Sequence, residues 1–386
     1  MSAEFFWRIP TQGDGRSVGI AGWNRGDWTK QSSRHLAPAK TRAGDRSSYY
    51  DYLTQVAQAA ELSGFDGALL PSAWNSEEPF LLAMLLAQRT RSLRLLPAFQ
   101  PAFLEPVYAA KIAATFQRIS GGRLEWNVIS GGSVVAQQAQ GDFLPHDERY
   151  DRTKEFLDVI AALWSGEPVR HHGKFYRVTN EGLPTPLAES RKPGIYFSGA
   201  SDAALDVAAK HADVYLMWLE PLNAVRENIQ RVDAAAEKYK RRPRYGIRVD
   251  IFARETEEEA WAEARRLWDG LGASVEHLGK HLTSSKGGDS VGAARQAALR
   301  PDNATRFEDY MIGPNLWAGL GLIRPGPTVG IFGSYQQVAE RLNDYIEAGI
   351  DNFILAANPH LEEAYRVGEE VLPLLRGRQR IQQAAE

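Results

Sequence analysis

Short apolar runs alternate with longer segments of helical periodicity along the chain. Leucine, β-branched and aromatic residues dominate the runs, as expected of buried strands. They cover residues 5–9, 67–70, 93–99, 124–129, 194–197, 214–218, 244–252 and 352–356. Amphipathic segments that predict helices include 52–63, 106–118, 152–165, 203–212, 222–239, 255–268 and 335–348. Eight strands that alternate with helices predict an α/β fold, a (β/α)8 TIM barrel formed by a single domain over residues 1–386.

An open, doubly wound sheet is the alternative for a similar number of strands. The Gly-x-Gly-x-x-Gly motif that binds dinucleotides in that fold does not directly follow any of the apolar runs. The closed barrel is therefore the preferred prediction.

Two connections are longer than ordinary loops. The first follows the first strand, over residues 11–48, and the second lies between strands seven and eight, over about 270–333. Both leave the C-terminal end of a strand, which is the face where barrel enzymes build their active sites. We expect a binding loop or a mobile lid in each, and the alternative is a solvated insertion with no role.

Composition excludes several classes of protein and site. The 386 residues include no cysteine, which excludes disulfides, thiolate metal sites and a cysteine nucleophile. A net charge of −3 gives no basic patch for nucleic acid, and no apolar run is long enough to span a membrane. No metal-binding motif occurs, and the N-terminus does not resemble a signal peptide. These features predict a cytoplasmic enzyme that binds no metal.

A candidate phosphate site follows the fifth predicted strand. Gly199, Ala200 and Ser201 lead into a helix, so backbone N–H groups and a hydroxyl would meet an anion there. The alternative is a plain serine N-cap after a glycine turn. His146 and Tyr150 stand four residues apart and would share one face of a helix, where they could contact a phosphate or an aromatic cofactor.

Charged residues near strand ends are candidates for substrate binding. Arg248 and Asp250 are two residues apart on the seventh strand, so their side chains point to the same face. They form either a structural ion pair or an anion site. Arg324 lies in the second long connection, and His360, just after the eighth strand, is a candidate acid or base. Trp218 ends the sixth strand and would form an apolar wall.

Several segments resemble the alkanesulfonate monooxygenases, which are two-component, reduced-flavin members of the bacterial luciferase-like family. The resemblance runs in order along the chain. It rests on the segments FWRIPTQGDG, ISGGRLEWNVISGG, HDERYDRTKEF, YFSGASD, IRVDIFARETEEEAW, GPNLWAGLGLIR and PHLEEAYRVGEEVLPLL. It implies a (β/α)8 barrel that takes reduced FMN from a separate NAD(P)H-dependent reductase and uses O2 to cleave an organosulfonate to an aldehyde and sulfite. It also implies a homodimer or homotetramer.

Site residues follow from the resemblance position by position. It places the flavin phosphate at Ser201 and the adjoining amides, with His146 and Tyr150 close by. It also places Ser72, Gln100 and Ser130, at the ends of three strands, around the flavin. Trp218, Arg248, Arg324 and His360 match positions that surround the sulfonate and the reactive flavin carbon.

Four departures from the family pattern fall in the substrate site. Gln12, Ser76, Asp250 and Asn358 stand where the sulfonate enzymes carry histidine, cysteine, histidine and tyrosine, and residues 19–47 are additional. We expect the flavin site to be retained and the substrate site to be altered. Asp250 favours a substrate with hydroxyl or cationic groups, so a sulfone, an aminocarboxylate or a heterocycle is an alternative substrate. Two further functions stay open, namely hydride transfer with a flavin or deazaflavin, and flavin binding by a non-catalytic carrier.

Overall fold

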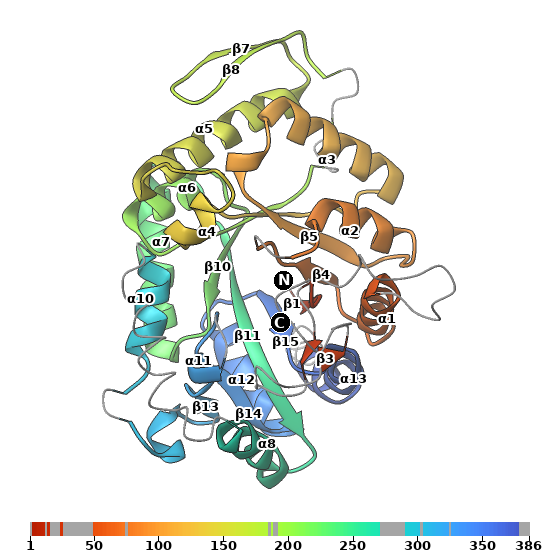
Figure 1. Ribbon diagram of the computed structural model, residues 1–386, viewed down its shortest axis with the longest axis vertical. Helices are drawn as coiled ribbons and strands as arrows, with labels where there is room; N and C mark the ends of the chain where they lie inside the picture. The colour runs from red at the N-terminus through yellow and green to blue at the C-terminus, as the bar shows by residue number, and fades with distance from the viewer. Residues whose placement is uncertain are drawn as a thin grey trace.

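Eight parallel strands form a closed ring in the computed structural model. The structure describes residues 2–11, 14–15, 24–25, 49–73, 76–183, 187, 192–270, 290–301, 304–323 and 326–377. Around the ring lie β1 (Glu4–Arg8), β4 (Gly67–Leu70), β5 (Arg94–Phe99), β6 (Trp126–Val128), β9 (Ile195–Ser198), β10 (Val214–Trp218), β11 (Arg244–Arg254) and β15 (Asn352–Ala356). β15 pairs with β1 and β11, and β11 pairs with β10, which closes the sheet. The prediction of a (β/α)8 barrel is confirmed (Figure 1).

Helices between the strands cover the outside of the barrel. They are α1 (Tyr49–Leu62), α2 (Pro79–Ala87), α3 (Pro106–Ser120), α5 (His146–Ser165), α6 (Asp202–His211), α7 (Leu222–Glu237), α8 (Glu257–Asp269), α12 (Tyr335–Glu347) and α13 (His360–Arg366), which a π-helical turn (η7, Val367–Val371) continues. Local sequence fixes several ends: Thr256 with Glu259 and Ser334 with Gln337 form capping boxes that start α8 and α12.

Large apolar side chains fill the barrel interior. The side chains on the inner face of the sheet form one buried cluster there. It consists of Phe6, Leu69, Leu96, Tyr196, Val214, Leu216 and Ile354. Gly67 makes this packing possible, because a Cβ atom at this position would lie 2.3 Å from the Phe6 ring. The interior is therefore a packed core, and a ligand has room only near the ends of the strands.

An ion network closes the N-terminal end of the barrel. The Arg94 guanidinium lies 2.8 Å from Glu4 and 3.4 Å from Glu125, and Arg244 lies 3.0 Å from Glu4. Burial raises the pKa of Glu125 to about 7 against the opposing effect of Arg94. This end of the barrel is filled by mutually paired side chains, which leaves the opposite end for a ligand.

The segment between β11 and β15 is more than a loop, which corrects the expectation for residues 270–333. Its described residues contain α10 (Val291–Ala298), η6 (Phe307–Tyr310), β12 (Met311–Gly313), β13 (Leu316–Trp317), α11 (Leu320–Ile323) and β14 (Gly330–Ser334). β14 adds to the second half of β11 in parallel. The Phe332 ring stacks on Phe252 with centroids 4.3 Å apart, and Trp317 is fully buried against Phe307. Aromatic packing therefore fixes residues 304–323 and 326–333 to the barrel.

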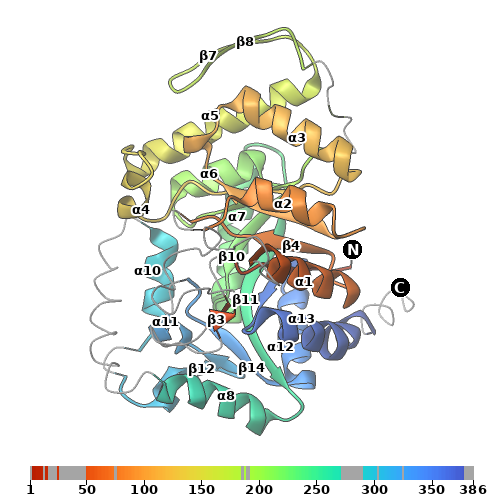
Figure 2. The same cartoon turned by 45° about the vertical axis from the view of Figure 1, so that its right-hand side comes forward.

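Several smaller elements were not predicted. They are the helices α2 and α4 (Val134–Gln138), the one-turn η2 (Pro101–Phe103) and two hairpins, β2 (Asp14–Gly15) with β3 (Asn24–Arg25) and β7 (Val169–His172) with β8 (Arg177–Asn180). The β7–β8 hairpin projects beyond α5 at one end of the molecule, far from α8 (Figure 2). Among the described residues, no helix combines the length and apolarity that a membrane span requires.

Candidate active site

Polar side chains project into the barrel at the C-terminal ends of the strands. Arg8 pairs in register with Leu69, Asn127 with Tyr196 and Arg248 with Ile354, and each of these partners lies in the interior core. Paired residues of neighbouring strands point to the same face, so all three polar side chains point inward. The C-terminal mouth of the barrel is therefore the candidate active site.

Three predicted cofactor residues, Gly199, Tyr150 and His146, lie together at the junction of β9 and α6. Gly199 has φ +145°, and a Cβ atom there would lie 2.5 Å from Ala204 Cβ and 3.0 Å from the Tyr150 hydroxyl. The His146 and Tyr150 rings are in contact, with centroids 4.9 Å apart, as their spacing on a helix predicts. Only glycine fits here, because Ala204 and Tyr150 already occupy the Cβ position, and the Tyr150 hydroxyl is thereby held close to the backbone of the junction.

The start of α6 provides the donors of a phosphate site. Ser201 is the N-cap, and its hydroxyl accepts a hydrogen bond from Ala204 N at 3.3 Å. Arg231 reaches this junction from α7, where Nη2 donates to the Ala200 carbonyl at 3.3 Å and lies 3.4 Å from Asp202 Oδ1. Helix N-termini attract anions, and an arginine strengthens that attraction. The geometry therefore suits a phosphate, and Arg231 is a residue that the sequence analysis missed.

Two buried amide oxygens lie on adjacent strands of the mouth. Gln100 follows β5 and Asn127 lies on β6, with exposed fractions of 8% and 9%. Within the described part of the chain, Gln100 Oε1 and Asn127 Oδ1 have no hydrogen-bond partner. A buried acceptor without a donor costs free energy, so this position suits a ligand that carries N–H groups. Gln100 was predicted, whereas Asn127 was missed.

Arg248 and Asp250 form a buried, two-point ion pair. Arg248 Nη1 lies 3.0 Å from Asp250 Oδ2, and Nη2 donates to Oδ1 at 3.2 Å. Arg248 is 8% exposed and Asp250 is fully buried. Trp218 stands beside Arg248 in the β10–β11 register and is only half-buried. Asp250 therefore offsets much of the charge that Arg248 brings to the mouth.

A second buried network joins the start of the chain to α13. Asp14 accepts hydrogen bonds from the His360 backbone N–H at 2.5 Å, from His360 Nδ1 at 2.9 Å, from Asn358 Nδ2 at 2.7 Å and from the Tyr52 hydroxyl. Arg8 Nη1 lies 3.3 Å from His360 Nε2. Both ring nitrogens of His360 are therefore engaged, one by a carboxylate and one by a guanidinium.

The charges of this network follow from its burial. Burial opposes the charged form of Asp14, but His360 and the hydrogen bonds lower the pKa of its carboxyl group to about 2. Burial lowers the pKa of His360 below its usual value, despite the attraction of Asp14. The network thus contains an ionised Asp14, a neutral imidazole protonated on Nδ1, and an Arg8 guanidinium that donates to Nε2.

The remaining predicted residues do not all meet at the mouth. Ser72 lies half-buried in the loop after β4. The Ser130 hydroxyl lies 2.9 Å from that of Thr153 on α5, on the helix side of the sheet. Gln12 and Arg324 lie outside the described residues, so their predicted roles stay predictions.

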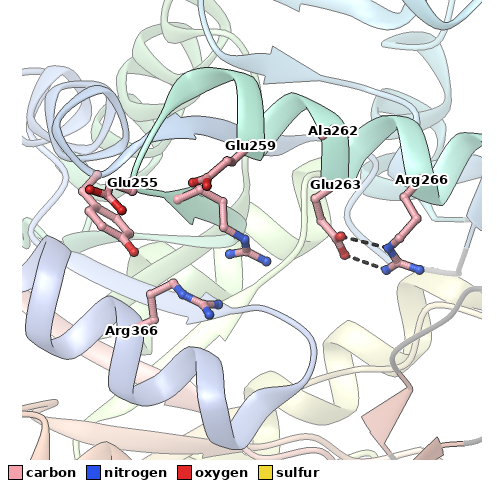
Figure 3. Close-up of a pocket in the computed structure, with 8 residues that line it drawn as sticks. Glu255, Glu259, Ala262, Glu263, Arg266 and Arg366 are labelled. Atoms are coloured by element: carbon pink, nitrogen blue, oxygen red, sulfur yellow. Dashed lines mark hydrogen bonds and ion pairs between the residues drawn. The ribbon is translucent and has the colours of Figure 1, made fainter.

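A charged groove lies outside the barrel, between α8 and α13 (Figure 3). It has a volume of about 520 Å³ and is lined mainly by arginine and glutamate side chains. Glu263 pairs with Arg266 on α8, and Glu363 lies between Arg254 and Arg366. None of the predicted site residues lines this groove, and its charges compensate one another.

Comparisons with known proteins agree with this architecture. Residues 31–352 match the family model of the luciferase-like monooxygenases. A riboflavin lyase solved with modified FMN and its substrate riboflavin is similar, with TM-score 0.74, 20% identity, and coverage of 98% of this chain and 92% of that one. The EDTA monooxygenase from Chelativorans sp. BNC1 gives TM-score 0.72, 18% identity and coverage of 98% and 95%. A long-chain alkane monooxygenase gives TM-score 0.73, 20% identity and coverage of 98% and 92%.

Proposed function

This chain belongs to the luciferase-like monooxygenase family, and on that premise we propose that it oxygenates an anionic organic substrate with O2 and reduced FMN. A separate NAD(P)H-dependent flavin reductase would supply the reduced FMN. The observation that carries the proposal is the β9–α6 junction, where the Ser201 N-cap, the Gly199 backbone and the Tyr150 hydroxyl lie close together at the N-terminus of α6. A carrier would need no inward ion pair such as Arg248 with Asp250, so we propose an enzyme.

The residues of the mouth fit FMN in two places. Ser201, the adjoining amides, His146, Tyr150 and Arg231 would hold its phosphate. Gln100 and Asn127 would accept hydrogen bonds from the N–H groups of its ring system, because their oxygens are buried without donors in the described residues. A flavin therefore fits groups that the fold leaves available.

The protein's own contribution is binding, orientation and exclusion of water. Reduced flavin supplies the chemistry that activates O2. Trp218 would form an apolar wall, and Arg248 would attract the anionic group of the substrate. Gln12 and Arg324 remain proposals for the same site. Because both nitrogens of His360 are engaged, we propose that it positions its neighbours, in place of the acid or base role that its sequence position suggested.

An organosulfonate is the substrate that we propose, with cleavage of its C–S bond to give an aldehyde and sulfite. The resemblance to alkanesulfonate monooxygenases and the inward Arg248 support it. Asp250 supports a second candidate, a substrate that also carries amino groups, because it offsets the charge of Arg248. The EDTA monooxygenase, which has a similar fold, is named for an aminocarboxylate of that kind.

Two measurements test this proposal. Titration of the protein with reduced FMN and with reduced riboflavin should show clearly tighter binding of FMN, and equal affinities would contradict the phosphate site. Photoreduced FMN, O2 and a panel of sulfonates should yield sulfite and aldehyde in equal amounts. Oxygenated products without sulfite would contradict an organosulfonate substrate and favour the second candidate, a substrate that also carries amino groups.

We propose a homodimer or homotetramer on the basis of an apolar surface. Helix α2 is apolar on all sides, and Leu81 and Leu85 are 69% and 45% exposed, with Tyr108 of α3 59% exposed. A helix of this composition is normally buried on every side. A second copy of the chain would cover this surface. A cytoplasmic location stays a prediction.

A further inference from the structure

Glu363 is a buried carboxylate in the first turn of α13 for which the sequence analysis gave no role. It lies three residues after His360, so the two side chains share one face of the helix. Both residues are only 1% exposed. Glutamate is almost never fully buried unless it is paired, so the partners of Glu363 explain its position.

Two arginines hold the carboxylate of Glu363. Oε2 lies 3.1 Å from Nη1 of Arg254, the last residue of β11, and Oε1 accepts a hydrogen bond from Nη1 of Arg366 on α13. Arg254 Nη1 also donates to the Ala253 carbonyl at 2.7 Å, which fixes the guanidinium against its own strand. Burial raises the pKa of Glu363, and both arginines oppose this effect. These three charged side chains, the α13 clamp, tie the helix to the end of β11.

His360 ties the same turn of α13 to the other side of β15. Its carbonyl accepts a hydrogen bond from Trp7 Nε1 of β1 at 3.1 Å, and its backbone N–H and ring contact Asp14. β15 pairs with both β1 and β11. The first turn of α13 is therefore anchored to the strands on both sides of β15, to β1 through His360 and to β11 through Glu363.

A groove lies beside the α13 clamp. Arg254 and Arg366 line it opposite α8, and Figure 3 shows Arg366 facing the charged side chains of that helix. An adjoining hollow of about 330 Å³ shares these arginines and is also lined by Glu363 and by Asn358, which donates to Asp14 at 2.7 Å. Charged side chains face one another along this groove, so the position of α13 depends here on the ion pairs of the clamp.

We propose that Glu363 is a positioning residue, which holds the first turn of α13 through Arg254 and Arg366 so that His360 keeps its contacts with Asp14. The two residues are about one turn apart on a hydrogen-bonded helix, so a displacement at Glu363 also moves the His360 ring. The inference rests on the proposed function, because it concerns the residues of the same barrel mouth.

NMR of the histidine side chains tests this link without turnover. In protein labelled with 15N at its 8 histidines, the ring nitrogens of a fixed neutral tautomer give two well-separated signals, and exchange between tautomers draws them together. His360→Asn identifies the signals of His360 by their loss. Glu363→Gln keeps the shape of the side chain and removes its charge. We expect it to draw the two His360 signals toward each other, while the signals of the other histidines do not shift.

Further variants separate positioning from stability. Arg254→Gln leaves Glu363 paired with Arg366, so it carries the test if Glu363→Gln does not fold, and it should cause the same change to a smaller degree. The double variant should shift the His360 signals no further than Glu363→Gln alone, because Arg254 acts through Glu363. Glu370→Gln, exposed on the π-helical turn that continues α13, is the matched control and should leave the His360 signals unchanged.

Steady-state kinetics relate the α13 clamp to the reaction. A displacement of about 1 Å in an active site can cost about 100-fold in rate. We therefore expect kcat/KM of Glu363→Gln to fall about 10- to 100-fold, while Glu370→Gln keeps the value of the unaltered protein. Glu363→Asp retains the charge and should recover part of the loss.

The outcomes separate this inference from the proposed function. If the clamp variants lose stability in urea unfolding but keep the His360 signals, Glu363 has only a structural role and the inference is refuted. An active enzyme whose kcat/KM is unchanged by Glu363→Gln would also refute it. If the unaltered protein turns over none of the panel with reduced FMN and O2, the proposed function fails, and the NMR signals alone decide the role of Glu363.

Discussion

Asp14→Asn is the most informative single substitution for the buried network. The Asp14 carboxylate accepts four hydrogen bonds, from Tyr52, Asn358 and two groups of His360, and it is fully buried. Asparagine keeps one oxygen and turns an amide N–H2 toward two of these donors. Breaking a buried charged network in this way costs about 3–5 kcal/mol. The lowering of the pKa of Asp14 from 3.8 to about 2 corresponds to a stabilisation of about 2 kcal/mol.

Urea unfolding at pH 7 measures this change in the free energy of unfolding. Because the folded pKa is lowered, the stabilisation by Asp14 is complete above pH 3.8 and is lost as the pH falls through about 2. The substitution should therefore destabilise the protein fully at neutral pH. Asp151→Asn, on the exposed face of α5, is the control and should change stability by less than about 0.5 kcal/mol. A loss below about 1 kcal/mol for Asp14→Asn would refute the network as described.

Three other substitutions test separate features. Gly199→Ala adds a Cβ atom 2.5 Å from Ala204 Cβ at a positive φ, so it should destabilise the protein by about 2–4 kcal/mol. In titrations it should also abolish the preference for reduced FMN over reduced riboflavin, and a retained preference would contradict the phosphate site. The raised pKa of Glu125 predicts a loss of about 3 kcal/mol in stability as the pH rises from 4.5 to 7, and thermal unfolding of Glu125→Gln should lack this dependence. Leu81→Asp should lower the mass measured by light scattering to that of a monomer, and an unchanged mass would exclude this face of α2 as the contact.

The barrel strands were predictable because their residue types are strongly biased. Three of the eight ranges agree at both ends with the structure, those of β4, β10 and β15, and the others differ by a few residues. β14 was missed because its short GIFGS segment, interrupted by glycine, shows neither strand alternation nor a long apolar run. Helix α2 was missed because its residues are apolar on all sides and so have no helical periodicity.

The candidate site was partly predictable for a similar reason. The spacing of His146 and Tyr150, and the alternation of Arg248 and Asp250, are local signals, and both pairs are in contact. Asp14 and His360 are 346 residues apart, so no local pattern could join them. The sequence did carry a signal for Arg8, because Arg8 and Phe6 are two residues apart and share one face of β1. Only the register of Arg8 with Leu69 shows that this face is the barrel interior.

The origin of the oxygen atom in the product tests the proposed monooxygenase most directly. The protein, photoreduced FMN and an anionic substrate identified by binding would be mixed with isotopically labelled O2 in unlabelled water, and the products would be analysed by mass spectrometry. Products that exchange oxygen with water, such as aldehydes and sulfite, would be trapped as they form. One labelled oxygen atom per substrate molecule is expected, and the label should be absent when FMN is omitted. Product that carries oxygen from water alone, or product formed without oxygen, would contradict a monooxygenase.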